Sequence, residues 1–209
     1  SRPGTMVSTW LNGLVSGTVV SNAGYFGGGT TGSYVATVDR FAFPDDSRTT
    51  LGTGLSAATY NLAGMANAGT AGYFGGGTAA GSVTTVDKFA FSDDSRTTLG
   101  TGLSLARNAL AGMANAGTAG YFGGGYSGSR DTTVDKFAFS DDSRTTLGTG
   151  LSVGRSGLAG MANSGTAGYF GGGYLGGGVY EATVDKFAFS DDSRTTLGTG
   201  LSAATRGVG

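Results

Sequence analysis

One heptapeptide, Ala-Gly-Tyr-Phe-Gly-Gly-Gly, occurs four times in the chain. Its tyrosines are Tyr25, Tyr73, Tyr121 and Tyr169, so that each copy follows the previous one after 48 residues. A fixed period of about 20–50 residues is typical of proteins built from repeated structural units, such as propellers and solenoids. The sequence therefore predicts an array of four similar units.

Each unit contains four short segments that favour β-strands. In the second unit these segments are residues 62–67, 72–75, 85–91 and 96–103. They contain β-branched and aromatic residues and are separated by Gly, Asp and Ser, which is the pattern of strands joined by turns. No segment shows the apolar spacing of an amphipathic helix with caps. Four strands in about 48 residues correspond to one propeller blade.

The segment 85–91 indicates how the strands are covered. Asp87, Phe89 and Phe91 alternate along it with Val86, Lys88 and Ala90. Apolar side chains on both faces are expected for a sheet that lies between two neighbouring sheets. Glycine accounts for 43 of the 209 residues, yet aromatic residues make up 11%, which distinguishes the chain from disordered Gly-rich sequences.

The Gly run after an aromatic pair, the Val-Asp-x-Phe strand and the Leu-rich last strand resemble the kelch repeat over residues 14–202. The resemblance implies an all-β fold, a β-propeller of four-stranded antiparallel blades. The units lack the later Tyr and Trp of kelch blades, and Trp10 is the single Trp. The repeats also resemble diverged kelch-type repeats of phage virion and tail-fibre proteins and of bacterial surface proteins. A β-solenoid is the alternative, although its rungs are shorter.

The repeat divides the chain into units. We predict an N-terminal overhang at 1–13, blades at 14–56, 57–104, 105–152 and 153–202, and a C-terminal overhang at 203–209. Residues 1–8 align with residues 49–56, and residues 203–209 resemble the approach to a further first strand. Two interpretations remain: the overhangs cap a small propeller, or the blades belong to a larger ring. Because kelch-type rings more often have six or seven blades, the second interpretation is favoured.

Several functions are not expected from the composition. The chain has no Cys and no His, which removes thiol and imidazole catalysis and the usual zinc ligands. The copper-radical chemistry of some kelch propellers needs both residues, so that we expect no enzyme, no cofactor and no metal. The net charge of −1 and the absence of a basic run argue against nucleic-acid binding. No apolar run has the length of a membrane span, and no membrane insertion is expected.

Two acidic motifs recur. An Asp-Asp pair opens the turn before the last strand of each unit, at residues 45–46, 93–94, 141–142 and 191–192. Carboxylate pairs can bind Ca²⁺, but the ligand ladder of a calcium loop is missing and Asp commonly initiates tight turns. We therefore predict structural turns. A further carboxylate lies in each third strand: Asp39, Asp87, Asp135 and Asp185. Four equivalent copies favour a repeated hydrogen bond to a neighbouring strand or turn over acid–base catalysis.

Variation among the units is concentrated in two kinds of connection, which we call the variable loops. The first joins the second and third strands, at 30–37, 78–85, 126–133 and 174–183, and the second joins successive units, at 57–61, 105–109, 153–157 and 203–207. Both connections leave an up-and-down meander at the same end. The other two turns are nearly invariant, whereas drift alone would loosen all of them. Because loops on a rigid scaffold commonly carry function, the variable loops predict a binding face, with drift as the alternative.

The candidate binding residues on the variable loops are aromatic or charged: Tyr34, Tyr60, Arg107, Tyr126, Arg130, Asp131, Arg155, Tyr174, Tyr180, Glu181 and Arg206. Tyr and Arg are enriched where proteins recognise partners. We expect a non-catalytic recognition or adhesion module, on a virion or cell surface, that binds a glycan or protein receptor. The alternative is a structural subunit that assembles with copies of itself in a fibre, sheath or virion. A hydrolase without His or Cys is a third, weaker alternative.

Overall fold

A computed structural model describes residues 23–43 and 45–207 of the 209-residue chain. The first unit contains β1 (Ala23–Gly27), β2 (Val38–Ala42) and β3 (Arg48–Thr50). The second contains β4 (Ala63–Asn67), β5 (Ala71–Gly75), β6 (Val86–Ala90) and β7 (Arg96–Thr98). The third contains β8 (Ala111–Asn115), β9 (Ala119–Gly123), β10 (Val134–Ala138) and β11 (Arg144–Thr146). The fourth contains β12 (Ala159–Asn163), β13 (Ala167–Gly171), β14 (Tyr174–Gly176), β15 (Val179–Tyr180), β16 (Val184–Ala188) and β17 (Arg194–Thr196).

Each unit is an antiparallel meander in which neighbouring strands are consecutive in the chain. Units 2, 3 and 4 each form a four-stranded sheet, and the described part of unit 1 forms a three-stranded sheet. The all-β fold of repeated blades is therefore confirmed. The first strand predicted for unit 1, together with the N-terminal overhang, lies outside the described residues. The last strand of each unit is shorter than predicted, because only three residues pair before the chain bends away.

The fourth unit has an extra hairpin in its longer variable loop. β14 and β15 pair as a separate two-stranded sheet. Gly177 and Gly178, with φ of 60° and 83°, form the tight turn between them. Positive φ at both central residues matches the twist of a two-residue hairpin and favours glycine there.

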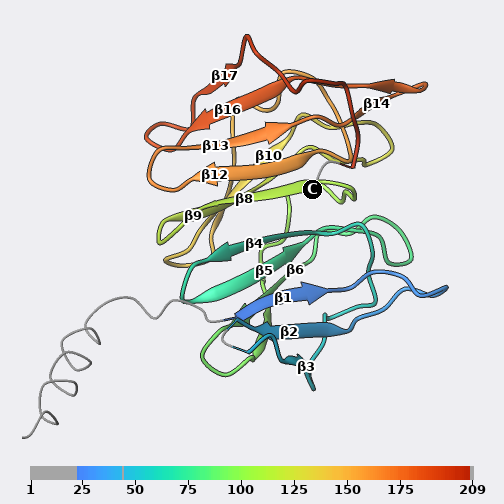
Figure 1. The fold of residues 1–209 in the computed structure, drawn as a ribbon, viewed down its shortest axis with the longest axis vertical. Coiled ribbons are helices and arrows are strands. Elements are labelled where there is room, and N and C mark those ends of the chain that lie inside the picture. Colours follow the sequence, from blue (N-terminus) through green and yellow to red (C-terminus); the bar gives the residue numbers. More distant parts are fainter. Residues whose placement is uncertain (1–22, 44, 208–209) are drawn as a thin grey trace, which may run out of the picture.

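The four sheets follow one another along the long axis of the molecule, with units 1 and 4 at opposite ends (Figure 1). The innermost strands β4, β8 and β12 lie against one another in that order. A closed ring of four blades does not describe this arrangement, because the two end units do not meet (Figure 1). We call the sheet face that points to the preceding unit the N-side face, and the opposite one the C-side face.

Aromatic rings and glycines hold neighbouring units together. Phe122 of unit 3 is fully buried, and its ring lies flat on Gly75 of unit 2. A Cβ added at Gly75 would lie 2.7 Å from that ring. Phe74 on Gly27 and Phe170 on Gly123 repeat the contact at the other two interfaces. The invariant glycine at the end of each second strand therefore makes room for the next unit.

A second set of contacts joins the repeated tyrosine to the following unit. Tyr73 stacks on Phe139 with ring centroids 5.3 Å apart, and its hydroxyl donates to Asp142 over 2.8 Å. Lys88 Nζ donates to the other oxygen of Asp142 over 2.7 Å. Tyr121, Phe189, Asp192 and Lys136 repeat this arrangement between units 3 and 4.

Tyr25 donates in the same way to Asp94, and burial, reinforced by that carboxylate, raises the pKa of Tyr25 to about 12. The Tyr73 and Tyr121 hydroxyls are shifted in the same direction by burial first and by Asp142 and Asp192 second, so that each pKa lies well above the ordinary value. These hydroxyls therefore stay protonated and donate across the interfaces.

The acidic motifs are structural, as predicted. The first carboxylate of each turn accepts the backbone N–H of the residue two positions later, as Asp93 does from Ser95 over 3.0 Å. The second takes a left-handed backbone, with φ between 55° and 58° in the four copies, and accepts the Tyr hydroxyl at each of the three interfaces. It also accepts Lys Nζ at two of them, whereas Asp94 faces Arg40 at 3.7 Å. The third-strand carboxylates bond to neighbouring segments: Asp87 accepts Ser56 N–H and Thr98 Oγ1–H.

Candidate functional site

The two kinds of variable loop meet at one end of the sheets, as predicted. Isolated bridges join them pairwise: Tyr60 with Thr78, Asn108 with Tyr126, and Ser156 with Tyr174. The side chains of this loop face therefore come from three successive interfaces. Residues more than 40 positions apart in the chain, such as Arg130 and Tyr174, become neighbours in this way, because each unit places its loops beside those of the next.

Five of the predicted residues form one continuous row, which we call the Tyr–Arg row: Tyr126, Arg130, Tyr174, Arg206 and Tyr180. The Arg130 guanidinium lies 5.2 Å from the centroid of Tyr126 and 4.7 Å from that of Tyr174. Arg206 lies 5.3 Å from Tyr174 and 5.8 Å from Tyr180. Cations and aromatic faces thus alternate, and each contact holds an otherwise mobile side chain in place.

The row remains open to solvent. Tyr180 is 43% exposed and Tyr126 is 36% exposed, and Arg206 is also exposed. Exposed rings beside guanidinium groups can stack on an apolar or sugar face while the N–H groups bind oxygen atoms. The row therefore has the chemistry of a recognition surface.

Tyr34 and Tyr60 form a separate pair at the other end of the loop face. Their rings stack with centroids 4.4 Å apart, and Tyr34 is exposed. Tyr34 comes from the loop of unit 1 and Tyr60 from the connection to unit 2. The stacked pair presents an aromatic edge without a neighbouring guanidinium among the described residues.

Arg107 and Arg155 do not lie on the binding face, in contrast to the prediction. Both side chains are completely buried between units. Arg107 donates through Nη2 to Asp135 over 2.9 Å and to the carbonyl oxygen of Phe122 over 3.0 Å. Arg155 makes the same bonds with Asp185 and Phe170. Their position is structural, because each guanidinium pairs with the buried third-strand carboxylate that follows it in the chain.

Asp131 and Glu181 stay on the loop face, where both side chains are half-exposed, and their charges act on the arginines buried beneath them. Burial lowers the pKa of the Arg107 guanidinium, and the charges of Asp135 and Asp131 oppose that effect. Burial also lowers the pKa of the Arg155 guanidinium, and the charges of Asp185 and Glu181 oppose that effect. The Thr183 hydroxyl donates to Glu181 and holds its pKa below the ordinary value, with a smaller contribution from Arg155. These acids balance interior charge.

Unit 2 lacks this cluster. Thr59 occupies the position of Arg107, and Val83 occupies the position of Asp131. A cavity of about 20 Å³ lies beside Thr59, Val83 and Asp87, which is enough for one water molecule. At this position of the repeat, Arg therefore occurs in the units whose loop between the second and third strands carries Asp131 or Glu181. Thr occurs in the unit whose loop carries Val83. This pairing along the chain is the signal that could have identified the buried arginines.

We expect Thr59→Arg and Val83→Asp to be coupled. Each change alone places a charge in the interface between units 1 and 2 without its full set of partners, whereas the double variant recreates the cluster of the next interface. Their coupling should favour the double variant by about 1 kcal/mol or more. Urea unfolding of the parent, both single variants and the double variant measures this energy. Additive effects would contradict the expectation.

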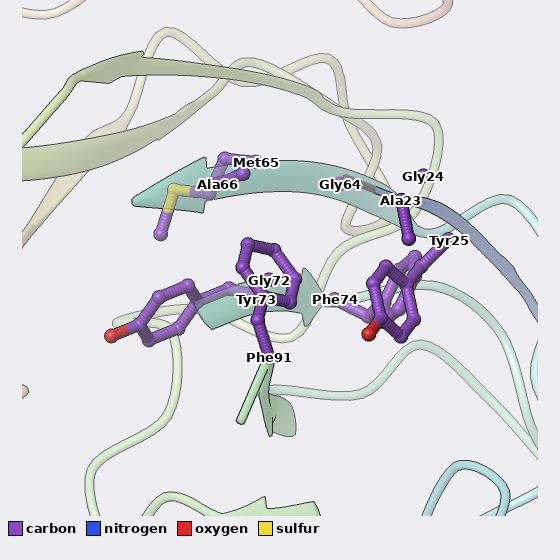
Figure 2. Close-up of a pocket in the computed structure, with 10 residues that line it drawn as sticks. All are labelled: Ala23, Gly24, Tyr25, Gly64, Met65, Ala66, Gly72, Tyr73, Phe74 and Phe91. Carbon is purple, nitrogen blue, oxygen red and sulfur yellow. The ribbon is translucent and has the colours of Figure 1, made fainter. Parts of the chain in front are cut away.

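A pocket of about 280 Å³ lies away from the loop face, between β1 of unit 1 and β4 and β5 of unit 2 (Figure 2). Its walls are small residues and the side chains of Met65, Phe74, Phe91, Tyr25 and Tyr73. The Tyr25 and Tyr73 hydroxyls already donate to Asp94 and Asp142. The pocket contains no charged side chain, and its lining resembles an interface between units more than a catalytic site.

Two further features concern cofactors and membranes. Within residues 23–43 and 45–207, no group of three or more acidic side chains is placed to hold a metal ion. In the same ranges, no helix has the length and apolarity needed to cross a membrane.

The meandering sheets, their innermost strands and their repeated interfaces define a propeller-like protein with kelch-type blades. A solved structure, described as the structure of YjhT, is similar to the chain, with a TM-score of 0.71 and 14% sequence identity. YjhT is a kelch-repeat β-propeller. The match covers 90% of this chain and 66% of the YjhT chain, slightly less than two thirds. The similarity concerns the fold. No family model and no curated protein matches the sequence.

Proposed function

We propose that the protein is a non-catalytic recognition module that binds a glycan or protein receptor through the Tyr–Arg row. The row itself is the observation that carries the proposal: three tyrosine rings and two guanidinium groups alternate on loops that vary from unit to unit. The scaffold under them is held by repeated buried contacts. A rigid base with variable aromatic and cationic loops is a common arrangement for binding.

The geometry favours an elongated ligand that carries anionic or hydroxyl groups. Arg206 and Tyr180 are exposed at one end of the row and Tyr126 at the other. Planar guanidinium groups pair with carboxylates in a bidentate manner, and aromatic faces stack on sugar rings or apolar side chains. An acidic surface glycan satisfies both requirements. The resemblance of the repeats to those of phage virion and bacterial surface proteins supports a location on a virion or cell surface.

We expect the Tyr126→Ala, Tyr174→Ala double variant to bind at least about tenfold more weakly than the parent, because two of the row's three rings are removed. A microarray of acidic and neutral oligosaccharides, together with binding to intact bacterial cells, provides the measurement. The melting temperature should change by only a few degrees, since both residues lie on the variable loops, outside the sheets of the four units.

Leu105→Ala is the matched control. Leu105 is an exposed apolar residue of a variable loop that lies outside the row. Its removal should leave binding unchanged. Equal binding by the parent and the double tyrosine variant would rule out the row as the binding site.

A structural role in an assembly is the second candidate. It is favoured by a separate observation, the uncovered sheet faces at the two ends of the array, which are described next.

A further inference from the structure

Within residues 23–43 and 45–207, the two end units each leave one sheet face uncovered. On the N-side face of unit 1, Phe26 is 70% exposed, although its equivalents Phe122 and Phe170 are fully buried. On the C-side face of unit 4, Met161 is 65% exposed, although its equivalents Met65 and Met113 are buried. The exposed residues are thus equivalents of side chains that are buried or half-buried at the interfaces inside the chain.

Unit 4 presents one complete half of the repeated interface. A shallow apolar pocket of about 270 Å³ lies over Gly171, Met161, Tyr169 and Leu201. Gly171 is the equivalent of Gly123, which receives the Phe170 ring. A Cβ at Gly171 would meet only side chains of its own unit, the nearest being Val184 at 3.4 Å. The place taken by a phenylalanine ring at the other interfaces is therefore vacant here.

The polar groups of this half are also available. Among the described residues, neither the Tyr169 hydroxyl nor Lys186 Nζ forms a hydrogen bond or ion pair. Their equivalents Tyr121 and Lys136 both donate to Asp192 of the next unit. Unit 4 therefore offers a hydroxyl and an ammonium group that are placed to bind a carboxylate.

Unit 1 presents the other half. Phe26 is the ring that would enter the vacant place, and Phe43, which is 63% exposed, is the ring that would stack on a tyrosine. Asp46 has the left-handed backbone of the acceptor position, with φ of 55°, like Asp94 and Asp142. Asp46 lacks a Tyr or Lys donor among the described residues. The carboxylate of unit 1 thus complements the two donors of unit 4.

We propose that a second copy of this chain docks its unit 1 on unit 4, which continues the array from one molecule to the next. Phe26 of the second copy would lie on Gly171, Phe43 would stack on Tyr169, and Asp46 would accept from Tyr169 and Lys186. The internal interfaces provide the template, because the Phe–Gly, Phe–Tyr and Tyr–Asp contacts each occur three times within the chain and the Lys–Asp contact occurs twice. The proposal goes beyond receptor binding and does not depend on it, since the Tyr–Arg row lies at the loop end and not on either end face.

Such a contact is heterologous, with a different surface on each partner. Heterologous contacts close into a ring when the rotation permits and otherwise extend into a filament. Either outcome leaves no uncovered end face inside the assembly. The loop faces of successive copies would then lie side by side, which would multiply any weak ligand affinity.

The first test is the mass of the 209-residue chain in solution, measured by light scattering and sedimentation over a range of concentrations. The parent should associate, whereas Phe26→Glu and Gly171→Gln should each weaken association by about tenfold or more. Gly171→Gln is compatible with the monomer, because its Cβ has only ordinary contacts. An equimolar mixture of the two variants should form a dimer, because each retains the end that the other has lost. Tyr126→Ala should associate like the parent, which separates this test from that of receptor binding.

A charge exchange supplies the second test. Asp46→Lys and Lys186→Glu should each reduce association. Their combination in one chain should restore it, because each contact between two copies again pairs a positive with a negative side chain, with the two signs exchanged. Far-UV circular dichroism shows that each variant is folded. A parent chain that stays monomeric at high concentration overturns the proposal. So does an assembly that is unaffected by the changes at both ends, or one in which the charge exchange fails to restore association.

Discussion

Asp135→Ala should lower the free energy of unfolding by about 3–5 kcal/mol, because it leaves a buried guanidinium without its counter-ion. Asp135 and Arg107 are both completely buried and lie 2.9 Å apart. The carboxylate also accepts Ser104 N–H over 3.0 Å and Thr146 Oγ1–H over 2.7 Å. One substitution therefore removes the acceptor for three donors and a charge that cannot be replaced by water.

The equivalent carboxylate in unit 1 provides the control. Asp39 binds Thr50 and Arg48, but both partners and Asp39 itself are accessible to solvent. Asp39→Ala should lower the free energy of unfolding far less, since water replaces the lost bonds. Urea unfolding, monitored by far-UV circular dichroism, compares the free energies of unfolding of the two variants. Equal losses would mean that the interior ion clusters do not stabilise the array.

The double variant Asp135→Ala, Arg107→Met tests the physical reason. If the loss in Asp135→Ala comes from the stranded charge, replacing Arg107 by an apolar side chain of similar length should recover most of it. If the loss comes from the missing backbone and hydroxyl bonds, the double variant should remain as unstable as the single one.

Gly112→Ala should destabilise the protein by about 3 kcal/mol, at the upper end of the usual cost of overpacking. Gly112 lies in β8, an innermost strand, and a Cβ there would overlap the carbonyl oxygen of Gly64 in β4. The obstacle is backbone and cannot rotate away. Relief requires the two innermost strands to move apart, which would also loosen the contact of Phe122 with Gly75.

Gly148→Ala is the control for this prediction. Gly148 follows the last strand of the same unit, and a Cβ there would have no neighbour within 4 Å. Its φ lies outside the left-handed region, so that alanine should be neutral or slightly stabilising by about 0.4–1 kcal/mol. Thermal unfolding of both variants measures the difference. A small effect at Gly112 would show that the innermost strands are packed less tightly than their backbones indicate.

Much of the candidate site could be predicted from the sequence. The loop face, the Tyr–Arg row and the Tyr34–Tyr60 pair all come from segments that vary among otherwise similar units. Two of the eleven candidates, Arg107 and Arg155, were wrongly placed on that face, because both side chains are buried. A loop position does not reveal whether its side chain points to solvent or into the interface, because the partner carboxylate lies in the third strand of the unit, 28 residues away for Arg107 and 30 for Arg155.

The end faces were missed for a related reason. Phe26, Met161 and Lys186 occupy invariant or nearly invariant positions, and comparison of the units gives no reason to distinguish them from their buried equivalents. Only the order of the units in space shows that, among the described residues, one face of the first copy and one face of the last copy are not covered by another unit.

The sequence by itself determined the period, the strands, the structural role of the acidic turns and the end of the sheets at which the variable loops emerge. These properties are local, since they depend on strand alternation, turn residues and the parity of a meander. Only the tertiary structure decided which arginines are buried, which rings and cations form one row, and which faces stay uncovered. Those properties depend on contacts between units, where burial and charge pairing are set by side chains distant in the chain.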